Sequence, residues 1–135
     1  MKTITVNASK SYDVIIGDGL ISSLPTLLKN AKIDGKLAIV TDKTVNSLYG
    51  DKLISALCGY DYALYVSDGG EECKSGAEFL NILEFLAENE FTRSDVVVAF
   101  GGGVIGDLAG FVASCYLRGV RFVQIPTTLL AMVDS

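Results

Sequence analysis

The segment Val96–Gly110, VVVAFGGGVIGDLAG, constrains the fold of this chain more than any other. It begins with an unbroken apolar run, continues with three consecutive glycines and ends with small, mostly apolar residues. An apolar run that glycines end predicts a buried strand, and the residues after the glycines predict the start of a helix. The first N–H groups of a helix lack intrahelical partners and its dipole favours negative charge, so this turn suits a phosphate group.

The glycines Gly101, Gly103 and Gly106 match the G-x-G-x-x-G fingerprint of dinucleotide-binding folds. That motif also requires an acidic residue about 20 positions later and lies in the first βα unit. Here the later position falls in Ile125–Thr128, IPTT, which has no carboxylate, and the glycines lie late in the chain. Spacing alone therefore favours two interpretations equally: a phosphate cradle, and a turn that lets a helix pack close to the sheet.

The rest of the chain alternates expected strands and helices. The expected strands are Thr3–Val6, Tyr12–Ile16, Lys36–Thr41, Tyr62–Val66, Val96–Phe100 and Arg121–Ile125. The expected helices are Leu20–Lys29, Thr44–Cys58, one with a capping box at Ser75 and Glu78, and one after the glycines. This order predicts one α/β domain, a parallel sheet with helices on both faces, preceded by a short N-terminal β pair.

Composition excludes several classes of function. Half of the 135 residues are hydrophobic, which argues against disorder, and the net charge of −5 argues against binding to nucleic acid or to an anionic membrane. No apolar run is long enough to span a membrane, and we expect no signal peptide. The three cysteines fit a reduced cytoplasmic protein, with Cys58 and Cys115 expected in the core. The chain has no histidine, the commonest general base and metal ligand.

Polar side chains follow the predicted strands, where parallel α/β sheets bind ligands. Asp42 is positioned to bind ribose hydroxyls or to cap the next helix. Glu71 and Lys74 would clasp a polar ligand or lie in a solvated turn. Asp107, expected in the first turn after the glycines, would contact a ligand or complement the helix dipole. Thr127–Thr128 offers two hydroxyls for a ligand or a helix cap.

Two further features have no single interpretation. Arg118 and Arg121 flank a glycine, and each is either a phosphate ligand or an ordinary surface arginine. The final segment, Leu129–Ser135, is apolar without a cap or a closing element, which predicts a domain cut from a longer protein. Asp134 lies in this segment, and its position alone indicates no role.

The strings GGGVIGDLAGFVAS, YLRG and RFVQIPTTLLAMVDS resemble the 3-dehydroquinate synthase family of the shikimate pathway of aromatic amino-acid biosynthesis. The resemblance is nearly continuous over Gly101–Ser135, and Tyr12–Gly19 and the element Glu71-x-x-Lys74 also fit. It implies that residues 1–135 are a Rossmann-like, NAD-binding N-terminal domain. It also implies that the helical C-terminal domain, whose glutamate and histidine ligands hold zinc or cobalt, is absent from this chain.

The resemblance implies cofactor contacts at matching positions. Asp42, Glu71 and Lys74 would hold the adenosine side of NAD, and the glycine turn would approach the pyrophosphate through its backbone. Asp107 would lie near the nicotinamide ribose. The implied cofactor-binding residues are Asp42, Gly70, Glu71, Lys74, Gly102, Gly103, Val104, Gly106, Asp107, Thr127 and Thr128. Cys73 and the loop Ser67–Gly70, which lacks a proline, depart from the family pattern.

The resemblance also implies the role of the whole protein. The family converts 3-deoxy-arabino-heptulosonate 7-phosphate to 3-dehydroquinate and phosphate, so the substrate is a phosphorylated sugar acid. Asp134 would touch this substrate, and Arg118 would reach the substrate phosphate of a neighbouring subunit. The implied enzyme is a cytoplasmic, NAD- and metal-dependent lyase that forms a homodimer. The chain alone, which holds neither catalytic residues nor metal ligands, is expected to be inactive.

Two alternatives remain open at this level. A related sugar-phosphate cyclase or an NAD-dependent polyol dehydrogenase shares the superfamily, although the stretches YLRG and PTTLLAMVDS favour the synthase. A non-catalytic phosphate-binding α/β module, such as a flavodoxin-like receiver, is an alternative of another class. In that fold an aspartate usually ends the third strand, whereas here the central strand ends in glycines.

Overall fold

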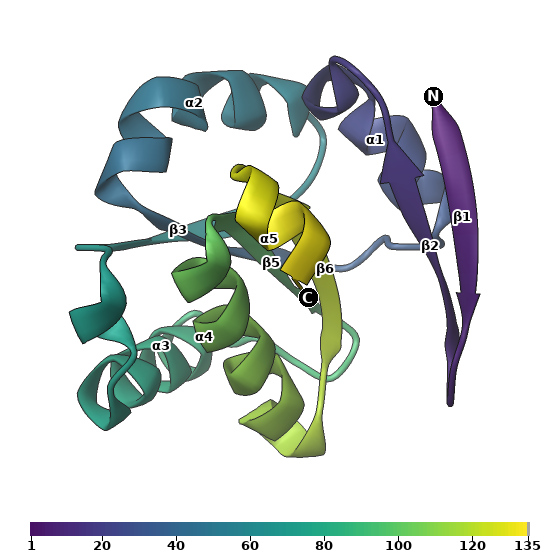
Figure 1. Ribbon diagram of the computed structural model, residues 1–135. Coiled ribbons are helices and arrows are strands. Elements are labelled where there is room, and N and C mark those ends of the chain that lie inside the picture. The colour runs from purple at the N-terminus through teal and green to yellow at the C-terminus, as the bar shows by residue number, and fades with distance from the viewer. Residues whose placement is uncertain (135) are drawn as a thin grey trace.

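A four-stranded parallel sheet forms the centre of the computed structural model, which describes residues 1–134 (Figure 1). The strands lie in the order β4-β3-β5-β6, and every neighbouring pair is parallel. They are β3 (Leu37–Asp42), β4 (Tyr62–Ser67), β5 (Val96–Gly101) and β6 (Arg121–Pro126). The predicted sheet is therefore confirmed. Ser135, the last residue of the PTTLLAMVDS stretch, lies outside the described residues.

Helices cover both faces of this sheet, as predicted (Figure 1). α1 (Leu20–Asn30) and α2 (Lys43–Ala56) pack on one face, and α3 (Gly76–Glu88) and α4 (Gly103–Cys115) pack on the other. Two 3₁₀ turns, η1 (Glu71–Cys73) and η2 (Tyr116–Arg118), and a short helix, α5 (Leu129–Asp134), complete the order.

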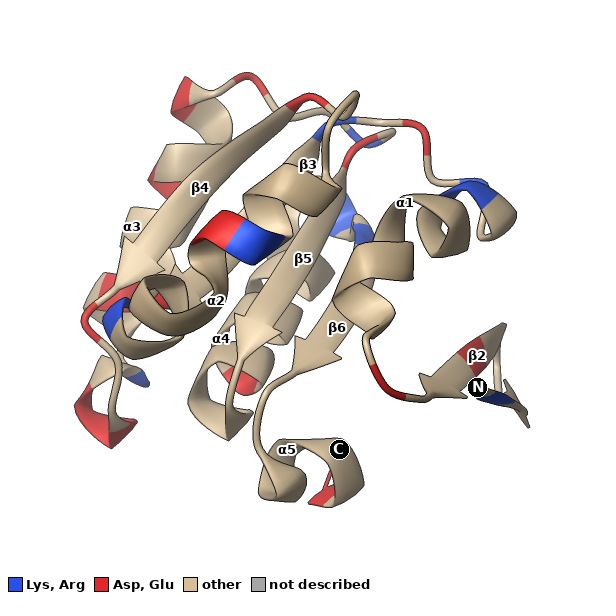
Figure 2. Cartoon of the chain, turned by 90° about the horizontal axis from the view of Figure 1, so that it is seen from above, with Lys and Arg blue, Asp and Glu red and all other residues tan. Residues whose placement is uncertain are grey.

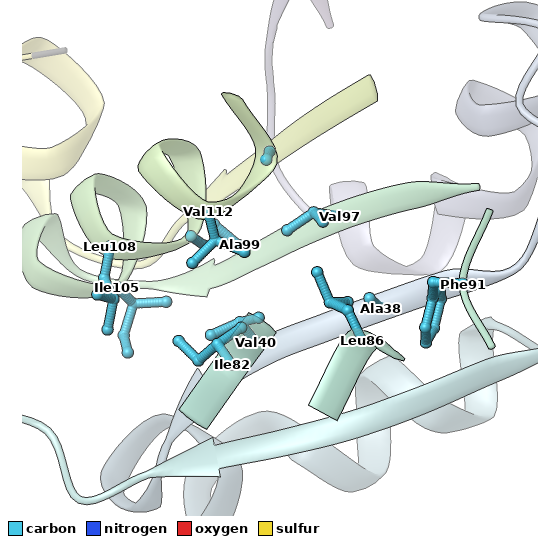
Figure 3. Close-up of a cluster of buried hydrophobic side chains, with 12 residues drawn as sticks. Ala38, Val40, Ile82, Leu86, Phe91, Val97, Ala99, Ile105, Leu108 and Val112 are labelled. Atoms are coloured by element: carbon cyan, nitrogen blue, oxygen red, sulfur yellow. The ribbon is translucent and has the colours of Figure 1, made fainter. Parts of the chain in front are cut away.

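Each central strand contributes to two cores because successive side chains point to opposite faces. Val40 of β3 and Ala99 of β5 pack against α3 and α4, and Figure 3 shows this cluster. Ile39 and Phe100 pack against α1 and α2 instead. Burial on both faces explains why these strands are continuous apolar runs without polar alternation.

The helix after the glycines buries a slightly different face from the predicted one. Its buried side chains are Ile105, Leu108, Ala109, Val112 and Ala113. Phe111 is exposed, and so are Cys115 and, just beyond α2, Cys58, the two cysteines expected in the core. Cys115 is the last residue of α4 and lies beyond its last buried residue, Ala113. The prediction of two cysteines in the core is therefore wrong.

The N-terminal β pair is confirmed as an antiparallel hairpin of β1 (Lys2–Asn7) and β2 (Ser11–Ile16). It forms a separate two-stranded sheet that precedes α1 in the chain (Figure 1). The predicted capping box of α3 is half formed, because Ser75 Oγ accepts from the N–H of Glu78 at 3.2 Å. The Glu78 carboxylate instead accepts from the Tyr65 hydroxyl at 3.0 Å, and burial together with this bond raises the pKa of Tyr65 to about 12.

Replacing Thr41 by valine is expected to stabilise the protein. Thr41 is fully buried in β3, and its hydroxyl has no hydrogen-bond partner among residues 1–134. Valine has nearly the same shape without the unpaired polar group, so we expect Thr41→Val to raise the free energy of unfolding by about 1–2 kcal/mol. A urea titration measures this as a higher midpoint at an unchanged slope. A lower midpoint would mean that the hydroxyl is paired in solution.

Candidate active site

The candidate site lies at the carboxyl edge of the sheet, between β3 and β5. After β3 the chain continues into α2 on one face, and after β5 it continues into α4 on the other. The register pairs Thr41 with Phe100, so the ends of these strands are neighbours. Diverging connections of this kind leave a crevice, the usual ligand site of open α/β sheets.

The three fingerprint glycines have different surroundings. A Cβ added at Gly101 would lie 2.8 Å from Cβ of Ile105, and one at Gly106 would lie 2.7 Å from the amide nitrogen of Gln124. A Cβ added at Gly103 would meet nothing within 4 Å among the described residues. Gly101 and Gly106 therefore serve close packing, whereas Gly103 borders open space. The packing interpretation is therefore confirmed for Gly101, whereas the phosphate cradle stays a prediction, for which Gly103 offers the open space.

The N-terminus of α4 begins at this open glycine. Gly102 is the cap residue, and no described side chain caps the helix there. The N–H of Gly106 is bonded to the carbonyl of Gly102 at 3.0 Å, so the N–H groups of Gly103 and Val104 precede the helical bonding pattern. This end of α4 can accept an anion through its backbone. Asp107 is the fifth residue of α4, so its expected place in the first turn is wrong, and the dipole interpretation weakens accordingly.

Asp42 ends β3 and caps α2. Its Oδ1 accepts from the N–H of Val45 at 2.9 Å, which confirms the helix-cap interpretation for that oxygen. The loop after β4 passes close to it, because a Cβ added at Gly69 would lie 3.2 Å from Cβ of Asp42. Asp42 therefore lies where β3 meets the loop after β4, at the crevice.

Lys74 joins two of the predicted elements. Its ammonium lies 2.7 Å from Oδ2 of Asp107 and 3.6 Å from Oε2 of Glu71. The bond to Asp107 raises the pKa of Lys74 above its ordinary value. Figure 2 shows charged residues of both signs near the carboxyl ends of β3 and β4. Glu71 and Lys74, which the sequence places in one element, thus lie together with Asp107, which it places in the helix after the glycines.

The two threonines after β6 have different partners. Thr128 Oγ1 accepts from the N–H of Ala131 at 3.1 Å, which confirms its helix-cap interpretation. The N–H of Thr127 donates to the carbonyl of Gly101 at 2.9 Å, so this residue adjoins the glycine turn. The hydroxyl of Thr127 is buried without a hydrogen-bond partner among residues 1–134. A buried unpaired hydroxyl beside the turn is a candidate ligand contact.

Arg118 lies at the amino edge of the sheet, opposite the crevice. It ends η2, just before β6 begins, so it cannot approach the crevice of its own chain. Leu117 and Arg118 have φ of 49° and 66°, in the left-handed region that residues with a Cβ rarely adopt. Arg121 donates to the carbonyls of Ala31 and Lys32 at 2.7 and 2.8 Å, which ties β6 to the end of α1. Asp134 is exposed in α5, which follows β6 on the crevice side of the sheet.

The sequence interpretation missed one ion pair at the carboxyl edge of the sheet. Lys43, the first residue of α2, pairs with Asp68 after β4. The strand register offers a signal for it. Asp42 of β3 is paired with Ser67 of β4, so the residues that follow them, Lys43 and Asp68, are neighbours. It also missed a hollow of about 330 Å³ beside Lys74 and Asp107, lined by Phe79 and Phe111 among others.

Two kinds of feature are absent from the described part of the chain. Residues 1–134 contain no group of three metal-ligating side chains. None of the helices in that range is long and apolar enough to cross a membrane.

Solved structures of known enzymes share this fold. The structure of 2-deoxy-scyllo-inosose synthase with carbaglucose-6-phosphate, NAD+ and Co2+ superposes with a TM-score of 0.87 at 23% identity, over 96% of this chain and 36% of that one. The 2-epi-5-epi-valiolone synthase of Streptomyces hygroscopicus subsp. jinggangensis, with NAD+ and Zn2+ bound, gives 0.83 at 34% identity, over 97% of this chain and 36% of that one. At 23% identity, the likeness to 2-deoxy-scyllo-inosose synthase shows the fold alone.

Sequence comparisons identify the family. The 3-dehydroquinate synthase of Enterococcus faecalis is 44% identical over all of this chain, which spans 38% of that relative's length. The family model described as 3-dehydroquinate synthase N-terminal matches residues 64–135, which include the glycine turn, β5 and β6. This chain belongs to the 3-dehydroquinate synthase family, of which it carries the N-terminal, Rossmann-like part.

Proposed function

We propose that residues 1–135 are the NAD-binding domain of a 3-dehydroquinate synthase. The observation that carries the proposal is the open space at Gly103, at the uncapped N-terminus of α4. A pyrophosphate needs a backbone that it can approach closely, and a glycine without neighbours beside its Cα offers one. The relatives of known structure that share the fold contain NAD+, which supports the same ligand here.

The crevice residues divide the proposed cofactor between them. Gly102, Gly103 and Val104 would bind the pyrophosphate by backbone N–H groups, and Gly106 would support them by packing α4 against β6. Asp107 would lie near the nicotinamide ribose, and Lys74 would contact the adenosine side. NAD, when bound, supplies reversible hydride acceptance. The same proposal assigns Asp42, Gly70 and Glu71 to the adenosine side and Thr127 and Thr128 to the exit of β6.

Titration calorimetry tests the proposal. We expect NAD to bind the folded chain at one site, with micromolar to millimolar affinity and a heat that saturates. Circular dichroism establishes that the sample is folded before the titration. A folded chain that gives no NAD heat at millimolar ligand would contradict the proposal and would favour the non-catalytic module.

Replacing Asp107 by alanine is expected to weaken NAD binding by about 1–3 kcal/mol, because a hydrogen bond to a charged group is lost. The same substitution frees Lys74, whose other neighbour, Glu71, is 3.6 Å away. Calorimetry of the variant gives the dissociation constant directly. As a matched control, Asp51→Asn removes a carboxylate from the exposed side of α2 and should leave NAD affinity unchanged. Equal affinity of Asp107→Ala and the parent would exclude Asp107 as a ligand.

At the level of the whole protein we propose the family reaction: a phosphorylated heptulosonate loses phosphate and closes to 3-dehydroquinate. Asp134 would contact that substrate. Arg118 lies at the opposite edge of the sheet, which supports a role in a neighbouring subunit and hence a homodimer. The left-handed backbone at Leu117 and Arg118 supports a functional turn there.

The residues described here do not supply a metal centre, since they have no histidine and no cluster of three ligands. The zinc or cobalt ion proposed for the intact protein would therefore be held by residues beyond this domain. We propose accordingly that residues 1–135 alone do not turn over the substrate. We also propose that the intact protein works in the cytoplasm. An assay of this chain with NAD, substrate and a divalent metal should give no phosphate release. Substantial release would show that the chain holds catalytic groups of its own.

A further inference from the structure

The segment Asp68–Lys74, here called the strap, is fastened at both ends to helices on opposite faces of the sheet. Asp68 pairs with Lys43, the first residue of α2. Lys74 pairs with Asp107 of α4 at 2.7 Å. Because α2 and α4 pack on different faces, the strap runs along the carboxyl edge from one layer to the other (Figure 1).

Between these two anchors the strap passes the candidate cofactor residues. Gly69 abuts Asp42, with 3.2 Å between Cβ of Asp42 and a Cβ added at Gly69. Gly69 and Gly70 have φ of 85° and 86°, so both occupy a backbone conformation that other residues rarely adopt. Beyond them the strap is internally bonded, because the N–H and the thiol of Cys73 donate to the carbonyls of Gly70 and Gly69, each at 3.0 Å. The strap is therefore a small ordered unit attached through two glycines.

The attachments of the strap are weak. The side chains of Lys43 and Asp68 are 70% and 78% exposed, and those of Lys74 and Asp107 are 39% and 56% exposed. Exposed ion pairs contribute little and are screened by salt. No residue from Asp68 to Lys74 is buried, so apolar packing adds little to hold the strap. A segment with exposed anchors and little packing belongs to the least stable part of a fold.

We propose that the strap is a gate over the cofactor crevice, which opens when Lys43–Asp68 and Lys74–Asp107 separate and through which NAD enters and leaves. The identity of the ligand rests on the proposed function, whereas the opening itself does not. Lys74 and Asp107 satisfy each other in the closed strap, so a ligand that bonds to either must exchange with this pair. The gate thus sets the rates of binding separately from the affinity.

Hydrogen exchange in the free protein tests the opening. Asp68→Asn removes one anchor without touching a candidate cofactor residue. The amides of Cys73 and Lys74 donate to the carbonyls of Gly70 and Glu71, in a turn too short to keep these bonds once an anchor is released. We expect them to exchange about two- to fivefold faster in this variant, the factor that one exposed ion pair is worth. Asp51→Asn is the matched control, since Asp51 is exposed on α2 and forms no ion pair within residues 1–134. Equal exchange in Asp68→Asn, the control and the parent would overturn the gate whatever the ligand is.

Stopped-flow kinetics with NAD tests the gating. In Asp68→Asn we expect the association and dissociation rates to rise by the same factor of about two to five, with an unchanged dissociation constant, because the anchor acts on the passage and not on the bound state. A change in the dissociation constant at a constant association rate would overturn the gate and make Asp68 a ligand contact. Failure of the parent chain to bind NAD would overturn the proposed function and NAD gating together, while the exchange result would still decide whether the strap opens.

Discussion

Gly103→Val is expected to abolish measurable NAD binding and to leave the fold intact. A Cβ at this position meets no described atom within 4 Å, so the free protein has room for the valine side chain. The same side chain would occupy the space through which a pyrophosphate approaches the N–H groups of α4. We expect the affinity to fall by about 100-fold or more, which corresponds to about 2.7 kcal/mol. Calorimetry measures the affinity, and a urea titration measures the stability.

A smaller substitution serves as the graded control for this result. Gly103→Ala adds one methyl group, so we expect an affinity between those of the parent and the valine variant. The free energy of unfolding should change by less than about 1 kcal/mol in either variant, because the position is at the start of a helix with open space beside it. Unchanged NAD affinity in Gly103→Val would contradict the assignment of the pyrophosphate to this turn.

Gly101→Val is expected to have the opposite profile, a large loss of stability. An added Cβ would lie 2.8 Å from Cβ and 2.9 Å from Cγ1 of Ile105. Cβ of Ile105 is attached directly to the backbone of α4, so it cannot move away as the end of a long side chain can. Overpacking of this kind costs about 3 kcal/mol, which lowers the urea midpoint strongly.

A double variant identifies the cause of that loss. Ile105→Ala removes the side-chain atoms that the new valine would touch, at the usual cost of a cavity. We expect the double variant Gly101→Val with Ile105→Ala to be more stable than the sum of the single effects predicts, by about 1 kcal/mol or more. Strict additivity would show that the close contact between Gly101 and Ile105 is not what makes glycine necessary.

Sequence pattern was sufficient for the architecture because burial leaves a direct trace in it. The segments of β3 and β5 are continuous apolar runs since both of their faces are covered, and this predicts a parallel sheet between helix layers. The strand ends then predict the crevice, and with it Asp42 and the glycine turn. These inferences need only periodicity and the position of each strand end along the chain.

The contacts within the site required the register and the helix phase, which spacing does not give. Lys74 reaches Asp107 because the loop after β4 runs beside α4, and nothing local to either residue indicates this. The different roles of the glycines depend on atoms of Ile105 and Gln124, each of which belongs to a different element from the glycine that it contacts. The packing of α4 on the sheet buries Ala109 and Ala113 and leaves Phe111 exposed, which a 3.6-residue period alone does not resolve.

The most direct test of the account is to map the NAD site by backbone amide NMR shifts. The account predicts that NAD shifts the amides of Gly102, Gly103 and Val104 most, followed by those of the strap. A second hollow, of about 490 Å³ and lined by Gly35 and Tyr60 among others, lies at the other edge of the sheet and should show no shifts. Shifts confined to that hollow, or none at the glycine turn at saturating NAD, would contradict the assignment of the cofactor to the carboxyl edge.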